Sequence, residues 1–475
     1  MLFHTAQFGL FLIAVLGLSA VLSDHRSARH VMLLVASYIF YAAWSVKYLG
    51  LIVFSTLLDY VIGDAIWRAE NPRWRKILLT LSLTGNLGVL AVFKYYGFFA
   101  DNLQALLGAV GLQVSMPVLH VLLPVGISFY TFQSLSYTID IYRGELEPRR
   151  NLVEFAMFVA FFPQLVAGPI VRAREFLPQL ENESGPDGRQ TSTGIYLILK
   201  GLIKKVLIAD ILAVYLVDPI FREPAKFGAF AILAAIYGFK FQIYNDFSGY
   251  TDIARGTGRL LGYELPINFR SPFKAWSIPE YWRRWHITMS TWFRDYLFYP
   301  LGGSRHGVVR TCCYALITMA VIGLWHGAAW NFVLWGTYYG VLLSFSIIVR
   351  HLRSRHRGTE QTLEVSGLRR FFQVVLIFHL TLIAGVLFRS PSLATIRDMW
   401  VASWDRLVGP GVSTEFLLLL VLAMVLHFAP EAFKDGAEER FSRLHPIVQG
   451  AVAALVIGIV SAMMGATNPY YYFQF

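Results

Sequence analysis

Long apolar stretches separated by short polar loops run along the whole chain. The stretch between Arg310 and Arg350, for example, contains no Asp, Glu, Lys or Arg. A helix that crosses a bilayer needs about 20 predominantly apolar residues. The pattern therefore predicts membrane spans, and the candidates are residues 7–22, 31–45, 48–66, 77–93, 103–123, 152–170, 195–217, 227–243, 311–330, 332–349, 371–388, 416–428 and 447–464.

Several of these stretches are too short to cross a bilayer as one straight helix. Such segments are tolerated at membrane depth when protein surrounds them, so we expect half-helices or re-entrant segments among them. The prediction is an all-α polytopic membrane protein with ten to thirteen spans in a single domain, residues 1–475. The first stretch, 7–22, lacks the basic residues that precede the core of a secretory signal, which favours an uncleaved first span.

The composition supports this class. Hydrophobic residues make up 56% of the 475 positions and the mean hydropathy is +0.52. Only 15% of positions are charged, against about 25% in ordinary soluble domains. That leaves too little polar surface to cover the core of a soluble protein of this size. Soluble, disordered and disulfide-stapled secreted proteins are therefore excluded.

The net charge of +11 sets the expected orientation. Arg26 and Arg29 lie in the first loop, Lys47 is alone in the second, and the third loop, 68–76, is strongly basic. Because basic loops stay in the cytoplasm, this alternation predicts an extracytoplasmic N-terminus. The basic loop 350–370 is also predicted to be cytoplasmic, and the spans after it bring the C-terminus outside. Basic residues dispersed among loops in this way give no support for nucleic-acid binding.

A histidine lies within one of the most apolar stretches. The sequence LWHGAAW places His326 beside Trp325, followed by Gly327 and two alanines. An ionisable side chain at membrane depth costs free energy, and imidazole is the usual general base near neutral pH. The small residues leave room for a close backbone approach or a narrow tunnel. Two interpretations stay open here: a catalytic base, or a histidine hydrogen-bonded between helices.

A second unusual region is AWSIPEYWRRWHITMSTWFRDYLFYPLGGS. A helical reading pairs Glu280 with Arg284 and puts Trp285 and Trp292 on one face, with His286 close to that face. An interfacial amphipathic helix is the alternative, because Arg snorkels to headgroups and Trp favours the membrane interface. That alternative accounts for the Arg and Trp residues better than for Glu280 and His286.

A third region, QIYNDFSGYTDIAR, follows an apolar run directly. It contains Asn245, Asp246, Ser248 and Asp252, and Gly249 interrupts the pattern. The two aspartates suggest a metal site, but no third carboxylate or histidine stands at a ligand spacing. Helix capping and structural hydrogen bonding are the favoured interpretation.

Other polar residues in apolar surroundings carry weaker signals. Residues 124–144, including Gln133, are predicted to line a pore or to form a seam between helices. His379, His427 and His120 lack Gly and Trp neighbours of the kind found around His326, so we interpret them as packing residues.

Taken together, these regions resemble the membrane-bound O-acyltransferase family. The resemblance rests on six motifs in order, PVGISFYTFQSLSYTIDIYRG, FPQLVAGP, YNDFSGYTDIARG, NFRSPF, EYWRRWHITMSTWFRDYLFYPLGGSR and LWHGAAWNFVLWG. They define a motif-bearing catalytic core at 124–336, and the nearest branch is bacterial and includes the membrane subunit of alginate O-acetylation. The resemblance implies a ring of helices around a central tunnel. It also implies that His326 is the catalytic base and His286 the second active-site residue, which would orient or polarise a thioester.

The resemblance further implies the reaction and its partners. The expected enzyme is an O-acyltransferase of the bacterial inner membrane that uses acetyl-CoA, with no bound cofactor or metal, for O-acetylation of an exported, alginate-like polysaccharide. Its expected partners are the lipid bilayer, an extracytoplasmic acetyltransferase and other exopolysaccharide machinery. Candidates for the tunnel or for donor binding are Asn245, Asp246, Ser248, Gln133, Trp325, Arg283 and Arg284.

The aromatic segment 468–475 resembles the tail of the small partner protein in D-alanyl transfer. That resemblance makes Tyr472 a candidate acyl relay, and an interfacial aromatic anchor is the alternative. Two other functions stay open: D-alanyl transfer to teichoic acids, and a non-enzymatic transporter or export scaffold.

Overall fold

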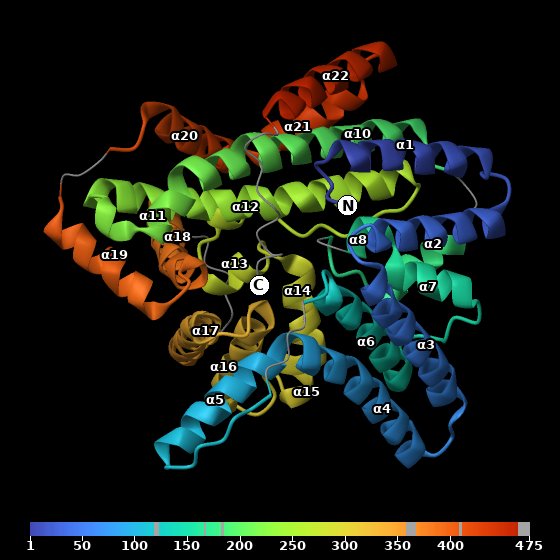
Figure 1. Cartoon of the computed structure of the whole chain (residues 1–475), viewed down its shortest axis with the longest axis horizontal. Coiled ribbons are helices and arrows are strands. Elements are labelled where there is room, and N and C mark those ends of the chain that lie inside the picture. The colour runs from blue at the N-terminus through green and yellow to red at the C-terminus, as the bar shows by residue number, and fades with distance from the viewer. Residues whose placement is uncertain (118–122, 166–167, 182–184, 358–366, 408–410, 464–475) are drawn as a thin grey trace. The chain divides into compact units, whose positions relative to one another are not determined.

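A computed structural model describes residues 1–117, 123–165, 168–181, 185–357, 367–407 and 411–463. Every regular element in these ranges is a helix, which confirms the all-α prediction. The chain divides into two compact units, the first formed by residues 1–191 and 257–266 and the second by 192–256 and the residues from 267 onward. The boundaries fall inside two helices, α10 and α12 (Figure 1).

The first unit contains the N-terminal helices. They are α1 (Ala6–Val21), α2 (Arg26–Ala42), α3 (Val46–Arg68), α4 (Pro72–Leu90), the π-helix η1 (Ala91–Tyr95), α5 (Tyr96–Ala109), α6 (Ile127–Arg143), α7 (Leu152–Ala160), α8 (Phe162–Leu165), α9 (Ala173–Phe176) and the 3₁₀-helix η2 (Leu177–Glu181).

The second unit begins within α10. Its elements are α10 (Gly188–Leu202), the π-helices η3 (Ile203–Asp210) and η4 (Ala213–Val217), α11 (Asp218–Arg222), the 3₁₀-helix η5 (Pro224–Lys226), α12 (Ala229–Leu260), the 3₁₀-helix η6 (Pro272–Lys274), α13 (Ile278–Trp282), α14 (Ile287–Phe293), the π-helix η7 (Arg294–Phe298), α15 (Tyr299–Leu301), α16 (Val308–His326), α17 (Trp330–Arg357), α18 (Gly367–Arg389), α19 (Leu393–Asp405), α20 (Thr414–Phe428), α21 (Glu431–Ser442) and α22 (Pro446–Met463).

Within the described residues, six helical segments are long and apolar enough to cross a membrane, and a bent helix pair, α20 with α21, raises the number to seven. The six segments are Val46–Arg68, Pro72–Ala109, Val308–His326, Trp330–Arg355, Gly367–Arg389 and Pro446–Met463. The protein is therefore a multi-pass membrane protein. The larger number of spans, the ring and the tunnel remain predictions.

Helix α6 forms a buried seam in the first unit. It packs against α3 and α4, and most of its side chains are buried. On α6 itself, Ser134 Oγ lies 3.1 Å from Ser55 Oγ of α3, and Thr138 Oγ1 accepts a hydrogen bond from Ser82 Oγ of α4 at 3.4 Å. Polar side chains on this seam thus bond between helices, as the sequence predicted for a helix–helix seam. The alternative of a pore lining stays a prediction.

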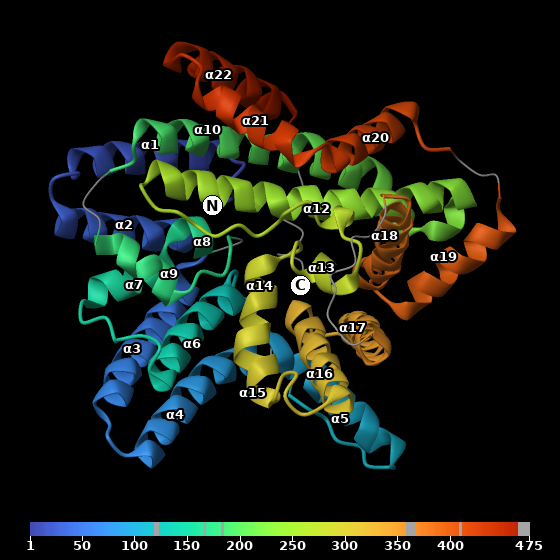
Figure 2. The same cartoon turned by 180° about the vertical axis from the view of Figure 1, so that it is seen from behind.

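Helix α12 of the second unit is not interrupted where the sequence predicted a helix end. It runs without a break from the apolar run through Gly249, so Asn245, Asp246 and Ser248 lie mid-helix and do not cap a terminus. The prediction of helix capping was therefore wrong, because tertiary contacts stabilise a continuous helix there. Gly249 does not break the helix; it lets α10 and its continuation pack directly on α12, and the two lie side by side (Figure 2).

The close approach at Gly249 has a measurable consequence. A Cβ on Gly249 would lie 2.8 Å from the carbonyl oxygen of Gly201, closer than real Cβ contacts allow. We expect Gly249→Ala to lower the free energy of unfolding by about 1–3 kcal/mol, as overpacking does. The matched change Gly450→Ala meets open space on α22, and alanine favours a helix, so it should leave stability unchanged or raise it. Thermal unfolding of both variants in detergent checks this, and equal midpoints would contradict the close approach.

Helices α16 and α17 form a tight antiparallel hairpin. A Cβ on Gly323 would collide with the backbone of Phe332, and one on Gly336 with the carbonyl of Met319. Small residues at such positions let membrane helices approach closely. The three residues between the helices therefore form a sharp turn directly after His326.

Candidate active site

His326 is the last residue of α16, where the chain turns into α17. Its side chain is buried, with 4% of its surface exposed. The ring centroids of Trp335 and Phe388 lie 4.9 and 5.3 Å from the imidazole centroid, and Trp325 lies 4.8 Å away. Helices α16, α17 and α18 thus enclose His326 with aromatic rings. The phenyl ring of Phe332 fills the space where a Cβ on Gly327 would lie, so a side chain, and not another backbone segment, packs against this glycine.

His286 lies in the break between α13 and α14. Its backbone φ is +42°, the left-handed region that residues other than glycine rarely adopt. The side chain is fully buried, with the ring of Phe247 at 4.7 Å and that of Phe269 at 6.4 Å. Its Nδ1 lies 3.1 Å from Oδ1 of Asn268. The break overturns the expected shared helix face of Trp285 and Trp292, because the two tryptophans stand on either side of it.

The side chain of Trp325 lies near both His286 and His326. The indole of Trp325 lies 6.0 Å from the imidazole of His286 and 4.8 Å from that of His326, measured between ring centroids. Both histidines belong to the second unit. The structure therefore brings together the two residues that the sequence singled out separately. Two buried imidazoles in a mostly aromatic environment suit proton transfer that is shielded from water.

A buried lysine on the same aromatic cluster was missed by the sequence analysis. The ammonium nitrogen of Lys240 lies 5.1, 5.2 and 5.6 Å from the ring centroids of Phe273, Tyr281 and Trp285. It donates a hydrogen bond to the carbonyl oxygen of Thr381 at 3.1 Å. In the sequence, the only signal for this site is a lysine near the polar end of the apolar stretch 227–243.

The two arginines of the candidate set bind a carboxylate. Arg284 Nε lies 2.6 Å from a carboxylate oxygen of Glu280, which confirms the predicted pair, and Arg283 Nε lies 3.3 Å from the other oxygen. Arg284 also lies over the ring of Trp276. The role of both arginines in donor binding stays a prediction.

The polar residues of α12 bind a row of lysines. Lys205 lies 2.7 Å from Asp246 and 2.7 Å from Asp210, so its ammonium group is paired with two buried carboxylates. Ser248 accepts a hydrogen bond from Lys204 at 3.3 Å. Asn245 donates to the carbonyl of Phe241, one helical turn back. Among the described residues, no three His, Cys, Asp or Glu side chains are grouped as metal ligands.

Two further candidates lie elsewhere in the chain. Gln133 belongs to α6 of the first unit and is fully buried, and neither of its amide atoms has a hydrogen-bond partner in the described ranges. Tyr472 and the aromatic segment 468–475 lie outside the described residues.

The histidines that served as comparisons behave differently from His326 and His286. His379 is hydrogen-bonded by both ring nitrogens, to Tyr237 Oη and to the Val375 carbonyl oxygen, each at 2.7 Å. His427 accepts a hydrogen bond from the backbone N–H of Phe273. The buried His427 fits the predicted packing role, His379 is exposed with both ring nitrogens hydrogen-bonded, and His120 lies outside the described ranges.

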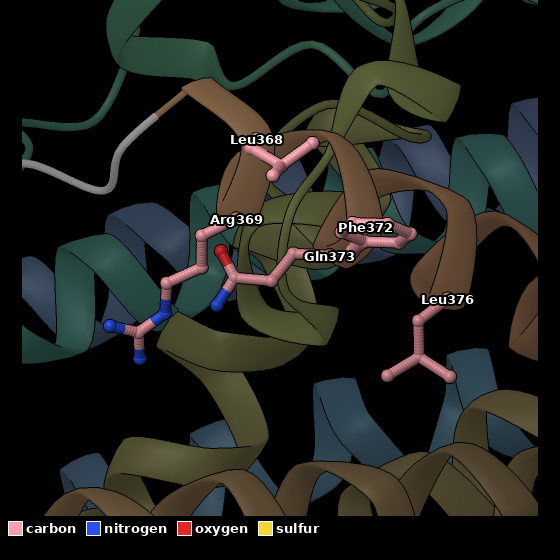
Figure 3. A pocket seen from close by; sticks show the side chains of 5 residues that line it. All are labelled: Leu368, Arg369, Phe372, Gln373 and Leu376. Atoms are coloured by element: carbon pink, nitrogen blue, oxygen red, sulfur yellow. The ribbon is translucent and has the colours of Figure 1, made fainter.

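A surface pocket lies apart from these motifs. It occupies the first turns of α18, has a cavity volume of about 440 Å³, and is lined by Leu368, Arg369, Phe372, Gln373 and Leu376 (Figure 3). None of its lining residues belongs to the six sequence motifs. It carries no part of the active site described above.

Comparison with known proteins decides the family. The model of the membrane-bound O-acyltransferase family matches residues 145–388, more than half of the chain. The chain belongs to the membrane-bound O-acyltransferase family. Family membership makes this multi-pass protein an O-acyltransferase, and the matched region includes both histidines, whose roles stay predictions.

Curated relatives cover most of the chain. The probable alginate O-acetylase AlgI of Azotobacter vinelandii is 40% identical over 83% of this chain and 77% of the relative. The protein of the same name from Pseudomonas putida is 39% identical, over 87% and 84% respectively. A peptidoglycan O-acetyltransferase of Helicobacter pylori is 33% identical, over 76% and 71%. This chain is thus similar to membrane-bound O-acyltransferases named for two different polysaccharides.

Proposed function

We propose that this protein moves an acetyl group from acetyl-CoA to a hydroxyl group for O-acetylation of an exported, alginate-like polysaccharide. The observation that carries the proposal is the pair of buried histidines that share Trp325, in the region of the family match. The names of the relatives support acetyl as the acyl group and a polysaccharide as the final acceptor.

The chemistry follows from the position of His326. Its imidazole takes the proton of the attacking hydroxyl, and the hydroxyl oxygen forms a bond to the acetyl carbon. The carbon–sulfur bond of the thioester breaks, and the thiolate of CoA takes the proton back from the imidazolium. The atoms balance as an alcohol plus a thioester giving an ester plus a thiol. The aromatic rings around His326 keep water from competing with the acceptor.

The cellular arrangement is part of the same proposal. The protein lies in the bacterial inner membrane with both termini outside, and acetyl-CoA enters from the cytoplasm. Tyr472 serves as the first acceptor, and an extracytoplasmic acetyltransferase of the exopolysaccharide machinery completes delivery to the sugar. The predicted topology and the aromatic sequence of residues 468–475 support this arrangement.

The direct test supplies acetyl-labelled acetyl-CoA to the purified protein in proteoliposomes. We expect release of CoA thiol and recovery of label on Tyr472, and Tyr472→Phe should remove the label. Label on another acceptor, together with release of CoA thiol, would support acetyl transfer but rule out Tyr472 as the acyl relay. Transfer of D-alanine from a charged carrier protein, without use of acetyl-CoA, would replace the proposal with D-alanyl transfer. Absence of any acyl transfer would favour a transporter or scaffold.

A further inference from the structure

Asn268 holds the strained turn at His286 with both its backbone and its side chain. Its carbonyl oxygen accepts a hydrogen bond from the N–H of Ile287 at 3.0 Å. Its Oδ1 lies 3.2 Å from the backbone nitrogen of Thr288, 3.0 Å from Thr288 Oγ1 and 3.1 Å from His286 Nδ1. A left-handed residue other than glycine is strained and persists only where its surroundings fix it. Asn268 supplies that constraint.

These contacts decide which nitrogen of His286 carries the proton. The backbone N–H of Thr288 can only donate, so the Asn268 atom that faces it is the oxygen. That same oxygen faces His286 Nδ1, which therefore donates and carries the ring hydrogen. A neutral imidazole has one N–H, so Nε2 holds a lone pair. This Nε2 is buried and has no hydrogen-bond partner among the described residues.

The surroundings keep the imidazole of His286 neutral. The rings of Phe247, Phe269 and Trp325 face it, and none of them is titratable. Burial lowers the pKa of His286 to about 3, without a contribution from a charged side chain in the described ranges. His326 lies 4.8 Å from Trp325, measured between ring centroids. His286 stands between α13 and α14, outside the membrane-spanning helices.

We propose that Asn268 is a positioning residue that fixes the Nδ1–H tautomer of His286, so that Nε2 accepts a hydrogen bond from an N–H or O–H group of a substrate. This inference rests on the proposed acyl transfer. A neutral Nε2 without hydrogen cannot donate to the thioester oxygen, so His286 orients a substrate and does not polarise the carbonyl. Two groups have the required chemistry: the hydroxyl of the acyl acceptor, and the amide N–H of acetyl-CoA nearest its thioester.

Removing the amide oxygen tests the positioning role. Loss of the group that orients a catalytic histidine lowers the rate on the order of 10⁴-fold in the best-studied case. We expect a smaller effect of about 10²-fold on acetyl transfer in Asn268→Ala, because His286 orients a substrate and is not the general base. A fall in kcat alone identifies the acceptor hydroxyl as the partner, and a rise in KM for acetyl-CoA identifies the amide. Gln449→Ala, which removes another buried amide of the second unit, should retain catalysis. Activity of Asn268→Ala within twofold of wild type overturns the proposal.

A second variant keeps the acceptor oxygen and adds a charge. Asn268→Asp preserves the Nδ1–H tautomer, but its carboxylate raises the pKa of His286 by favouring the imidazolium. As the pH falls, the variant therefore loses the active neutral form of His286 at a higher pH than the wild type does. We expect partial activity and, in ¹⁵N NMR of the histidine-labelled protein, a protonation midpoint of the His286 ring displaced upward by about one pH unit or more. A protonation midpoint identical to that of wild type would show a purely structural role for Asn268.

The tautomer can be observed without catalysis. In solid-state NMR of protein labelled with ¹⁵N-histidine in lipid, the signals missing from His286→Asn identify this residue. We expect a protonated Nδ1 and an unprotonated Nε2 in the wild type, and loss of that preference in Asn268→Ala. A protonated Nε2 in the wild type overturns the inference even if acetyl transfer occurs. Inactivity of the wild type with acetyl-CoA would instead reject only the proposed function.

Discussion

His326→Ala is expected to abolish acetyl transfer. A general base contributes about 10²–10⁴-fold to the rate, and the rings of Trp335 and Phe388 beside His326 cannot act as replacement bases. The turnover number should fall on the order of 10³-fold, measured as release of CoA thiol by protein in proteoliposomes. The unfolding midpoint should fall moderately, because alanine leaves a cavity among the aromatic rings, so both proteins are assayed at a temperature where they are folded.

The matched control for this variant is another histidine in an apolar helix. His379 is bonded to Tyr237 and to the Val375 carbonyl, and the rings of Tyr237 and Phe378 lie beside it. We expect His379→Ala to retain acetyl transfer within a few fold. Product formed at the wild-type rate by His326→Ala would remove the catalytic assignment, whereas equal losses in both variants would indicate a general packing effect.

The largest stability effect is expected at Lys205. Its side chain is 1% exposed, and its ammonium nitrogen lies 2.7 Å from a carboxylate oxygen of Asp210 and 2.7 Å from one of Asp246. Lys205→Met would leave two buried carboxylates without this cation. Removing one partner of a buried ion pair costs about 3–5 kcal/mol, so we expect the unfolding midpoint in detergent to fall sharply.

Two further variants separate charge from packing. Lys226 forms an exposed pair with Glu223, and Lys226→Met should cost less than about 1 kcal/mol. Adding Asp210→Asn and Asp246→Asn to Lys205→Met removes the uncompensated charge and should restore much of the lost stability. If Lys205→Met unfolds at the wild-type temperature, the ion-pair cluster does not stabilise the second unit.

Several features of the site could be predicted from the sequence because their signals are local. His326 was visible because it is an ionisable residue in a stretch without charges, and the Glu280–Arg284 pair because it follows helical spacing. Periodicity failed at His286 because a left-handed turn breaks the helix there. It failed again at Gly249, where contact between helices stabilises a continuous α12 that the local pattern did not indicate.

By itself, the sequence determined the membrane class, the helical fold, the enzyme family and the two candidate histidines. Hydropathy and ordered motifs are properties of neighbouring residues, so the linear chain carries them in full. Only the tertiary structure decided that Trp325 lies near both histidines and that Asn268 contacts His286 Nδ1. Those facts depend on hydrogen bonds and ring contacts between residues far apart in the chain, whose geometry no local pattern of residues specifies.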